Sequence, residues 1–560
     1  MAFQVSPGVL VQEKDLTRII PAVSTSIGAF AGTFTKGPMD EVVSISSEQE
    51  LVATFGKPNN SNFEDFFSAA NFLQYSNALR VVRVQNSSVS NATESGSAFV
   101  IKNTIDYTNN YAAGQASVGL WAARTAGAHG NSLQISTCPS ATAYEEVNKT
   151  TVADAAMAVG DTVVTVSSAT GISAGDIVNF GDQYEYRVIS VSTNDLNIVR
   201  KEEPAYFGTS ESSGLHQAPT NGAQVRRRWK YYDLFNKAPG TSPAVSAKGG
   251  SGDELHIVVI DEDGEITGTK GDVLETFEAV SKASDAKDAQ GNVNYYPDVI
   301  YKSSNYIYWM DHNAGGSNWG SAANGTTFTD VTAVSNVSLQ SGSDGTTATT
   351  GQRKTAYEKF EDGETVDVGL IIAGAGDATH IGNLITIAEN RKDAVVFASP
   401  ERSDVVGIAD ANTQKSNVVA FFNSIQSSSY VVFDSGYKYA YDRYNDVYRF
   451  VPLNGDVAGL AARTDLVADS WFSPAGFNRG IVRGAVKLAF NPTKAQRDEL
   501  YRARVNPVAT FPGQGTVLFG DKTGLSAPSA FDRINVRRLF ITLEKAIATA
   551  SKFQLFEFND

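Results

Sequence analysis

The fold class is indicated most directly by residues 366–398, VDVGLIIAGAGDATHIGNLITIAENRKDAVVFA. The apolar run at 366–372 predicts a strand, the spacing over 381–390 predicts a helix, and 394–398 predicts a second strand. The pattern continues with a helix at 418–425 and a strand at 431–433. Strands that alternate with helices imply βαβ crossovers, so we predict an α/β domain around a largely parallel, mixed sheet.

The same pattern occurs near the start of the chain, in residues 24–85. Strands are predicted at 27–34 and 79–84. Ser47 opens a capping-box sequence before a short helix, and Asn62 can cap a second helix. The second helix carries apolar residues at helical spacing: Phe63, Phe66, Phe67, Ala70 and Leu73.

A β-rich insertion separates the two parts of this discontinuous core domain, which we place at residues 24–85 and 363–470. Residues 86–362 are rich in Ser, Thr, Asn and Gly. Short strands are predicted at 163–166, 177–180, 184–191 and 196–199. Turn residues separate these strands, which predicts a small antiparallel barrel or sandwich. Strands at 257–260 and 266–269 flank an Asp263-Gly264 turn and predict a hairpin.

The two ends of the chain are predicted to lie outside the core domain. We place an α+β C-terminal domain at 471–560, with a final helix at 534–552. One face of that helix carries Val536, Leu539, Phe540, Leu543 and Ile547. Residues 1–23 form an N-terminal arm, in which Phe3–Glu13 alternates like a strand. Such a segment can add itself to another subunit's sheet, and the alternative is a disordered tail.

The composition excludes several classes of function. The 560 residues carry 46 Lys and Arg against 61 Asp and Glu, and the net charge of −15 gives no general attraction to nucleic acid or anionic membranes. The single cysteine, Cys138, excludes an intrachain disulfide and a cysteine-based zinc site. No apolar run approaches the roughly 20 residues of a membrane span, so no membrane insertion is expected. The first residues lack the pattern of a signal peptide, which predicts synthesis in the cytoplasm.

The motifs predict no catalytic residue, cofactor or metal. The histidines lie too far apart for a metal-binding helix motif: His129, His216, His256, His312 and His380. Gly374-Ala375-Gly376 follows a predicted strand as a dinucleotide-binding turn does, but Thr379 stands where the third glycine belongs, so we favour an ordinary βα turn. The acidic stretch 261–264 lacks the spacing of a calcium loop. Phosphate-loop and nucleophile-elbow sequences are also missing, so we predict no enzyme.

One basic and aromatic segment could bind nucleic acid. Residues 226–232, RRRWKYY, could stack on a single strand. Because the chain has a net charge of −15, we favour a salt-bridged strand or a subunit contact, and we expect no nucleic-acid partner.

Several motifs at the two ends of the chain resemble one known family. In the N-terminal part they are Ser6-Pro7-Gly8-Val9-Leu10-Val11-Gln12-Glu13, Pro21-Ala22-Val23-Ser24-Thr25-Ser26, Phe55-Gly56-Lys57-Pro58 and Ala69-Ala70-Asn71-Phe72-Leu73. In the C-terminal part they are Trp471-Phe472-Ser473-Pro474-Ala475-Gly476-Phe477-Asn478-Arg479-Gly480 and Ile534-Asn535-Val536-Arg537-Arg538-Leu539. These motifs are similar to the tail sheath proteins of contractile-tailed phages, especially T4-like myophages. The middle of the chain is where such proteins vary by insertion.

The resemblance implies a structural, non-enzymatic role. Sheath subunits of this family associate with one another as stacked hexameric rings, and the rings form a helical sheath around a tail tube. Contraction of the sheath drives the tube through the host envelope. The implied partners are other copies of the chain and the tail tube, baseplate and tail terminator proteins. The implied location is the virion tail, after assembly in the host cytoplasm.

The resemblance also implies an inter-subunit arm. In this family, terminal arms complete sheets in neighbouring subunits. Here the residues that match the N-terminal arm are Gly8, Val9, Leu10, Val11, Gln12 and Glu13.

The chain departs from the family after residues 534–538. Family members usually continue with further strands and a C-terminal arm, whereas this chain ends at Phe558-Asn559-Asp560, which implies a truncated form or a reduced tether. Two other function classes are kept as alternatives. One is a β-rich virion adhesin or receptor-binding protein, and the other is a nucleotide-dependent enzyme built on the Gly374 turn.

Overall fold

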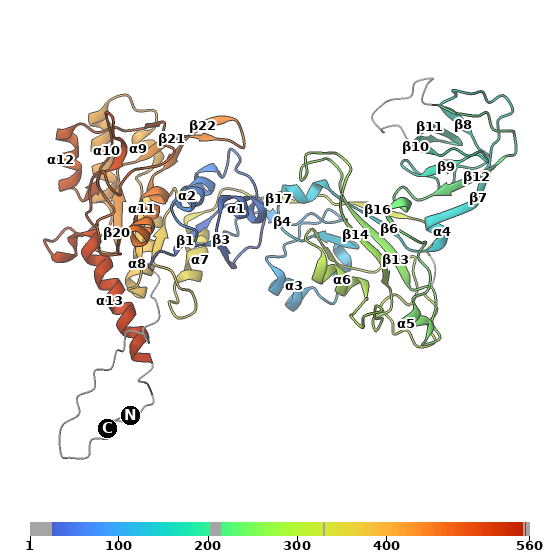
Figure 1. Cartoon of the computed structure of the whole chain (residues 1–560), viewed down its shortest axis with the longest axis horizontal. Helices are drawn as coiled ribbons and strands as arrows, with labels where there is room; N and C mark the ends of the chain where they lie inside the picture. Colours follow the sequence, from blue (N-terminus) through green and yellow to red (C-terminus); the bar gives the residue numbers. More distant parts are fainter. Residues whose placement is uncertain (1–24, 202–213, 329–330, 553–554, 556–560) are drawn as a thin grey trace, which may run out of the picture. The chain divides into compact units, whose positions relative to one another are not determined.

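The computed structural model describes residues 25–201, 214–328, 331–552 and 555 (Figure 1). They divide into two compact units, a core unit that contains the described residues up to 89 and from 344 onward, and an inserted unit of residues 90–343. The chain passes between the units within β4 (Val89–Ser90) and β17 (Ser343–Asp344). The core unit is therefore discontinuous in sequence, with different boundaries from those that the composition suggests.

A seven-stranded sheet forms the centre of the core unit, in the order β2-β3-β1-β18-β19-β20-β24. Its strands are β1 (Gly28–Gly32), β2 (Val42–Ile45), β3 (Leu79–Arg83), β18 (Leu370–Ile372), β19 (Val395–Ala398), β20 (Val431–Asp434) and β24 (Val505–Asn506). Every pairing is parallel except that of β2 with β3. The predicted α/β fold with a largely parallel, mixed sheet is confirmed.

Helices cover both faces of this sheet. They are α1 (Glu48–Phe55), α2 (Phe63–Leu73), α7 (Thr350–Tyr357), α8 (Ala378–Arg391), α9 (Arg402–Val405), α10 (Ala411–Asn423), α11 (Asn454–Val467), α12 (Lys494–Arg502) and α13 (Ile534–Lys552). Side chains of successive strand residues point to opposite faces. Ile372 accordingly packs in the apolar cluster of α2 and α11, whereas Ile371 packs in the cluster of α7, α8 and α10.

The structure corrects two sequence-based boundaries. Helix α7 belongs to the core unit, although its glycine- and threonine-rich surroundings place it in the predicted insertion. Arg353 holds it there through two contacts with the Asp65 carboxylate, of 3.0 and 2.9 Å, and the Tyr357 hydroxyl donates to the Ile372 carbonyl oxygen at 2.5 Å. Residues 471–552 are also part of the core unit, because β24 pairs with β20.

Helices α1 and α2 begin where the sequence predicts, but Asn62 does not cap α2 with its side chain. The Ser47 side chain accepts from the Glu50 N–H and begins α1 as predicted. Asn62 precedes α2, but its side chain accepts from the Asn59 N–H at 2.7 Å and makes no capping bond within the helix. Helix α2 is buried on almost every side, because α11 packs against it as well as the sheet.

Glycine allows α11 to approach α2 closely. A β-carbon at Gly455 would lie 2.2 Å from the Ser68 carbonyl oxygen, whereas one at Gly382, in α8, would meet nothing within 4 Å. We expect Gly455→Ala to destabilise the core unit by about 1–3 kcal/mol or more, because the backbone contact must open. The matched control Gly382→Ala should instead raise stability by roughly 0.5–1 kcal/mol. Chemical denaturation of both variants measures the difference, and equal stabilities would contradict the proposed close contact.

Sheets dominate the inserted unit. A six-stranded antiparallel sheet in the order β7-β12-β9-β10-β11-β8 consists of β7 (Glu145–Thr151), β8 (Val163–Thr165), β9 (Ile177–Asn179), β10 (Tyr186–Ser192), β11 (Asp195–Arg200) and β12 (Gln224–Arg228). A bridge between Val152 and Val166 joins its two edge strands. Of the predicted small antiparallel barrel or sandwich, the structure has the barrel.

A second sheet of the inserted unit, in the order β14-β13-β6-β16, has a longer hairpin than predicted. The remaining elements of this unit are α3 (Thr104–Asn110), β5 (Trp121–Ala123), β6 (Leu133–Cys138), α4 (Ala141–Tyr144), α5 (Pro243–Ser246), β13 (Glu254–Asp261), β14 (Asp272–Ser281), α6 (Tyr296–Ser303), β15 (Ile307–Trp309) and β16 (Ser335–Ser338). Residues 266–269 are loop, because the Asp261 carboxylate accepts from the Ile266 and Thr267 N–H groups at 3.0 and 2.7 Å. The second strand of the hairpin therefore begins only at Asp272.

Candidate assembly surface

The predicted arm residues, Gly8 to Glu13, lie outside the described residues. The described part of the core unit nevertheless shows where partners could bind. Its exposed large apolar side chains all come from residue 441 onward. They are Tyr441, Val447, Tyr448, Leu466, Val467, Trp471, Phe472, Phe477, Ile481, Val486, Phe519, Phe540, Leu543, Ile547 and Leu555. Where such side chains are contiguous, they form a candidate protein-binding surface.

Three phenylalanine rings form one cluster on this surface. The ring centroid of Phe477 lies 5.2 Å from that of Phe511 and 5.7 Å from that of Phe519. The Arg497 guanidinium lies 5.1 Å from the Phe511 ring. The cluster forms because the segment around Gly476 runs beside β26 (Gly515–Leu518), the partner of β25 (Val508–Phe511). Exposed aromatic rings with an arginine are typical of interface centres.

A three-stranded sheet offers an unpaired edge. Its order is β22-β21-β23, with β21 (Tyr437–Asp442), β22 (Val447–Pro452) and β23 (Lys487–Leu488). Among the described residues, β22 pairs only with β21. The rings of Tyr441 and Tyr448 are exposed on this hairpin, with centroids 5.1 Å apart. An open strand edge of this kind can accept a strand from another chain.

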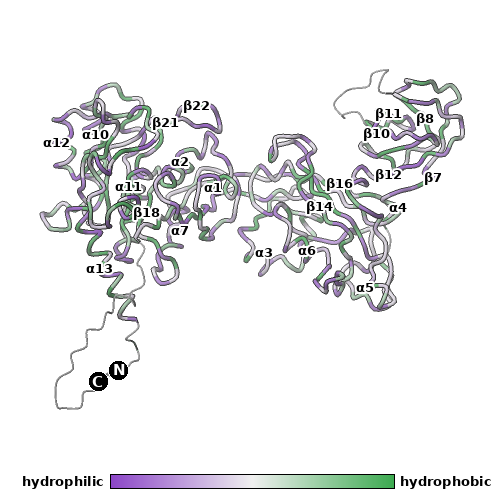
Figure 2. Tube along the Cα trace, in the orientation of Figure 1, coloured by the Kyte–Doolittle hydropathy of each residue, from purple (hydrophilic) through white to green (hydrophobic). Residues whose placement is uncertain are grey.

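Helix α13 packs on the rest of the core unit by a different face from the apolar one that the sequence predicts. Its buried side chains are those of Ile534, Arg537, Arg538 and Ile541. Arg538 Nη2 lies 2.7 Å from Asp465 Oδ2, and Arg537 Nη2 donates to Ser429 Oγ at 2.6 Å. The predicted apolar face exists, but Phe540, Leu543 and Ile547 expose 39%, 47% and 63% of their surface. Figure 2 shows hydrophobic and hydrophilic colours alternating along α13.

Charge is divided unevenly along the chain. Residues 90–343 carry 16 Lys and Arg against 28 Asp and Glu, whereas residues 471–560 carry 13 against 7. The part of the chain that supplies most of the exposed apolar side chains is therefore basic. Arg537 and Arg538 of this part are buried, and the basic side chains that remain exposed favour partners with acidic groups.

The Gly374 turn lies at a cavity of about 590 Å³, but the cavity is unsuited to phosphate. Three carboxylates line it, those of Glu64, Asp377 and Glu401, against one cationic side chain, that of Arg402. The Asp377 carboxylate accepts from the His380 N–H at 2.7 Å and so caps the start of α8, where a phosphate would bind. The geometry favours the ordinary βα turn over nucleotide binding.

His380 and Cys138 serve structural roles in the described part of the chain. His380 is buried, its Nε2 lies 3.0 Å from the Ala373 carbonyl oxygen, and burial lowers its pKa to about 4. Burial raises the pKa of the Cys138 thiol to about 12. Among the described residues, no group of three His, Cys, Asp or Glu side chains could hold a metal ion.

The basic segment 226–232 is used inside the inserted unit. Arg227 Nε lies 3.0 Å from Asp176 Oδ2, and Arg228 Nη1 lies 2.6 Å from Glu185 Oε1. The indole N–H of buried Trp229 donates to Ser136 Oγ at 2.9 Å. Of the predicted salt-bridged strand or subunit contact, residues 226–228 form the salt-bridged strand, as part of β12, and the rings of Trp229 and Tyr231 are buried.

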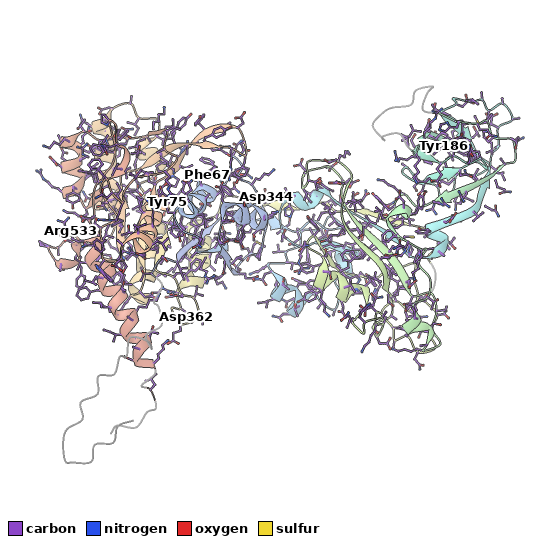
Figure 3. All side chains as sticks on the ribbon, in the orientation of Figure 1. Phe67, Tyr75, Tyr186, Asp344, Asp362 and Arg533 are labelled. Atoms are coloured by element: carbon purple, nitrogen blue, oxygen red, sulfur yellow. The ribbon has the colours of Figure 1, made fainter. Side chains whose placement is uncertain are left out.

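A network of buried polar groups supports the candidate assembly surface from within. Lys438, in β21, lies 2.8 Å from the Asp456 carboxylate of α11, which also accepts from the Tyr75 hydroxyl at 2.9 Å. Tyr75, which is labelled in Figure 3, in turn accepts from the Arg483 N–H at 2.6 Å. The network therefore joins α11, the end of α2, the β21 hairpin and the segment before β23.

A second buried carboxyl in this core, Asp434, predicts a dependence of stability on pH. Burial, with a smaller contribution from Asp456, raises its pKa to about 8 from 3.8. The stability due to the protonated carboxyl is fully present below about pH 4 and is lost as the pH rises through about 8. Within that window we expect a slope of up to roughly 1.4 kcal/mol per pH unit. Asp434→Asn should flatten the slope in chemical denaturation. An unchanged slope in this variant would contradict the assignment.

Among the described residues, no helix combines the length and hydropathy that crossing a bilayer requires.

Two family models match the chain, and both matches lie in the core unit. "Phage tail sheath protein central domain" matches residues 346–524, and "Tail sheath protein Gp18 domain III N-terminal region" matches residues 25–84. The two matches flank the inserted unit and include α7, in agreement with the boundaries of the structure.

Full-length relatives agree with these matches. The chain is 32% identical to the tail sheath protein of Enterobacteria phage T4, over 99% of this chain and 87% of the relative. It is 31% identical to the tail sheath protein of Salmonella phage ViI, over 100% of this chain and 86% of the relative. A solved sheath tail protein from Listeria innocua aligns with a TM-score of 0.47 at 9% identity, over 96% of this chain and 80% of its own.

These relatives are structural components of the phage tail and not enzymes. Identity above 30% over almost the whole length of both chains establishes that they belong to the same family. The chain belongs to the family of phage tail sheath proteins.

Proposed function

We propose that this chain polymerises as stacked hexameric rings into a helical sheath around a tail tube, and that contraction of the sheath drives the tube through the host envelope. The observation that carries the proposal is the exposed apolar surface of the core unit, which begins at residue 441. A subunit that assembles must leave apolar surface uncovered before it meets its neighbours.

We propose that the N-terminal arm joins neighbouring subunits. Residues Gly8 to Glu13 would add a strand to a sheet edge of a neighbour, and the open edge of β22 is a suitable acceptor. Pro7 has no N–H to donate, so the paired segment begins near Gly8. The arm lies outside the described residues, and its sequence pattern supports this role.

The proposed partners follow from the same role. They are other copies of the chain, the tail tube protein, and baseplate and tail terminator proteins, met after synthesis in the host cytoplasm. The basic character of residues 471–560 supports an acidic partner, which we take to be the tube. No nucleic-acid partner and no membrane insertion are part of the proposal.

Electron microscopy of the purified chain tests the proposal directly. A sheath subunit forms rings or tubes. A compact oligomer that binds host cells would instead support the adhesin alternative, in which the inserted unit carries a ligand site. Thermal stabilisation by a nucleotide would support an enzyme built on the Gly374 turn.

The inserted unit is proposed to be dispensable for the fold of the core unit. Asn86 Nδ2 donates to the carbonyl oxygens of Asp344 and Thr346 at 2.9 and 2.6 Å, so the two ends of the interrupted core chain lie close together. We expect a chain with residues 90–343 replaced by a short linker to fold, as measured by circular dichroism. A matched chain that joins Val84 to Val366 also loses α7 and should be much less stable. Complete unfolding of the first chain would contradict the proposal.

A further inference from the structure

An apolar stripe of α13 is largely exposed among the described residues, although the Phe540 ring centroid lies 4.8 Å from that of Phe531. Phe540, Leu543 and Ile547 are spaced at intervals of three and four residues, so they lie on one side of the helix. This side is opposite to the one that Arg538 and Ile541 bury against the core unit. An amphipathic helix that buries two arginines and exposes most of its apolar stripe lacks a packing partner for the exposed part of that stripe.

The chain enters the core unit beside this helix. Thr25 is the first described residue, and its hydroxyl donates to Asp465 Oδ2 at 2.7 Å. Arg538 of α13 bonds the same carboxylate at 2.7 Å, and its Nη2 lies 3.5 Å from the Thr25 carbonyl oxygen. The segment that precedes Thr25 therefore begins at a point that the Arg538 side chain of α13 reaches.

Those residues have the composition and the length to cover the stripe. Residues 16–23 read LTRIIPAV, of which Leu16, Ile19, Ile20, Pro21, Ala22 and Val23 are apolar. Eight extended residues span roughly 26–29 Å. The stripe from Phe540 to Ile547 extends over about 10 Å of helix.

We propose that residues 16–23 dock in cis along the exposed stripe of α13. Because the segment is tethered at Thr25, its local concentration at the stripe is in the millimolar range, so it occupies the stripe ahead of a second copy or another protein. Residues 1–15 would then project from a fixed base with a reach of roughly 50 Å. This docking does not depend on strand exchange by residues 8–13, and it concerns the single, unassembled chain.

Cysteine pairs in the full-length chain test the proposal. Cys138 is buried, so introduced thiols are the ones that react under mild oxidation. The pair Ile20→Cys with Leu543→Cys places one thiol in the segment and one on the stripe. The control pair Ile20→Cys with Ala548→Cys uses an exposed position on another side of the same helix. A second pair, Ile20→Cys with Ile547→Cys, allows for a shift in register.

In dilute protein we expect a disulfide within one chain to form for a stripe pair at least about tenfold faster than for the control pair, at a rate independent of protein concentration. Non-reducing electrophoresis and intact mass distinguish this product from a disulfide between chains. If most disulfides form between chains, a second copy of the chain occupies the stripe. Equal rates for all pairs would show that the segment does not dock, and either outcome overturns the proposal. Rings formed by the reduced variants report on the proposed function separately.

Discussion

A chain that lacks residues 1–15 is expected to fold with an almost unchanged melting temperature and to form neither rings nor tubes. The strand from Gly8 to Glu13 would make about four to six backbone hydrogen bonds to a neighbour, each worth roughly 0.5–1.5 kcal/mol. The loss of several kcal/mol at every subunit contact abolishes polymerisation. None of these bonds stabilises the subunit that carries the arm, so its own unfolding transition stays in place. Thermal unfolding and electron microscopy of the same preparation measure the two effects.

Point variants separate the loss of hydrogen bonds from the loss of length. Val9→Pro with Val11→Pro keeps all residues but removes two N–H donors, and it should also prevent assembly. Val9→Thr with Val11→Thr keeps the backbone bonds and should still form tubes. A deletion that unfolds the isolated subunit would show that the arm packs on its own unit. Intact tubes from the deleted chain would show that surface contacts alone hold the sheath together.

Lys438→Met should destabilise the core unit by about 3–5 kcal/mol, because it leaves the carboxylate of Asp456 buried without its cation. Both partners are fully buried, at an Nζ to Oδ1 distance of 2.8 Å. Burial already raises the pKa of Asp456, and Lys438 opposes that shift most strongly. Hydrogen exchange of peptides from β21 and α11 reports on the core unit without a contribution from the inserted unit.

A double variant and a surface control make this result specific. Lys438→Met with Asp456→Asn removes both charges and should recover much of the loss. Lys415→Met breaks an ion pair of similar length, 2.5 Å to Glu499, in which the glutamate side chain is half exposed. That variant should cost less than about 1 kcal/mol. Equal costs for Lys438→Met and Lys415→Met would show that the buried pair has no special role.

Much of the core unit could be predicted because its signals are local. Alternating apolar strands and helices from residue 366 onward led to the parallel sheet, and Ser47 begins a helix as its capping-box sequence indicates. Helix α7 also has a capping box at Thr349, but its assignment to the core depends on the Arg353–Asp65 contact, between residues that are distant in the sequence. Composition cannot report such a contact.

The candidate site was less predictable for a related reason. Periodicity finds the apolar stripe of α13, but it does not distinguish a stripe that is buried within the subunit from one that is exposed for another segment or chain. The buried face of α13 contains Arg537 and Arg538, and a hydropathy pattern predicts that such charged side chains face the solvent. The Lys438–Asp456 pair likewise gives no sequence signal, because each charged side chain is ordinarily expected at the surface.

The division of the core sheet between two parts of the chain also controls when the subunit can form. Strands β1 to β3 are synthesised before the 254 residues of the inserted unit, and β18 to β24 are synthesised after them. At ribosomal speeds of about 5–20 residues per second, the first part waits roughly 10–50 s for its partners. The exposed surface after residue 441 is made last of all. A nascent chain therefore completes its core sheet, and presents this exposed surface, only near the end of synthesis.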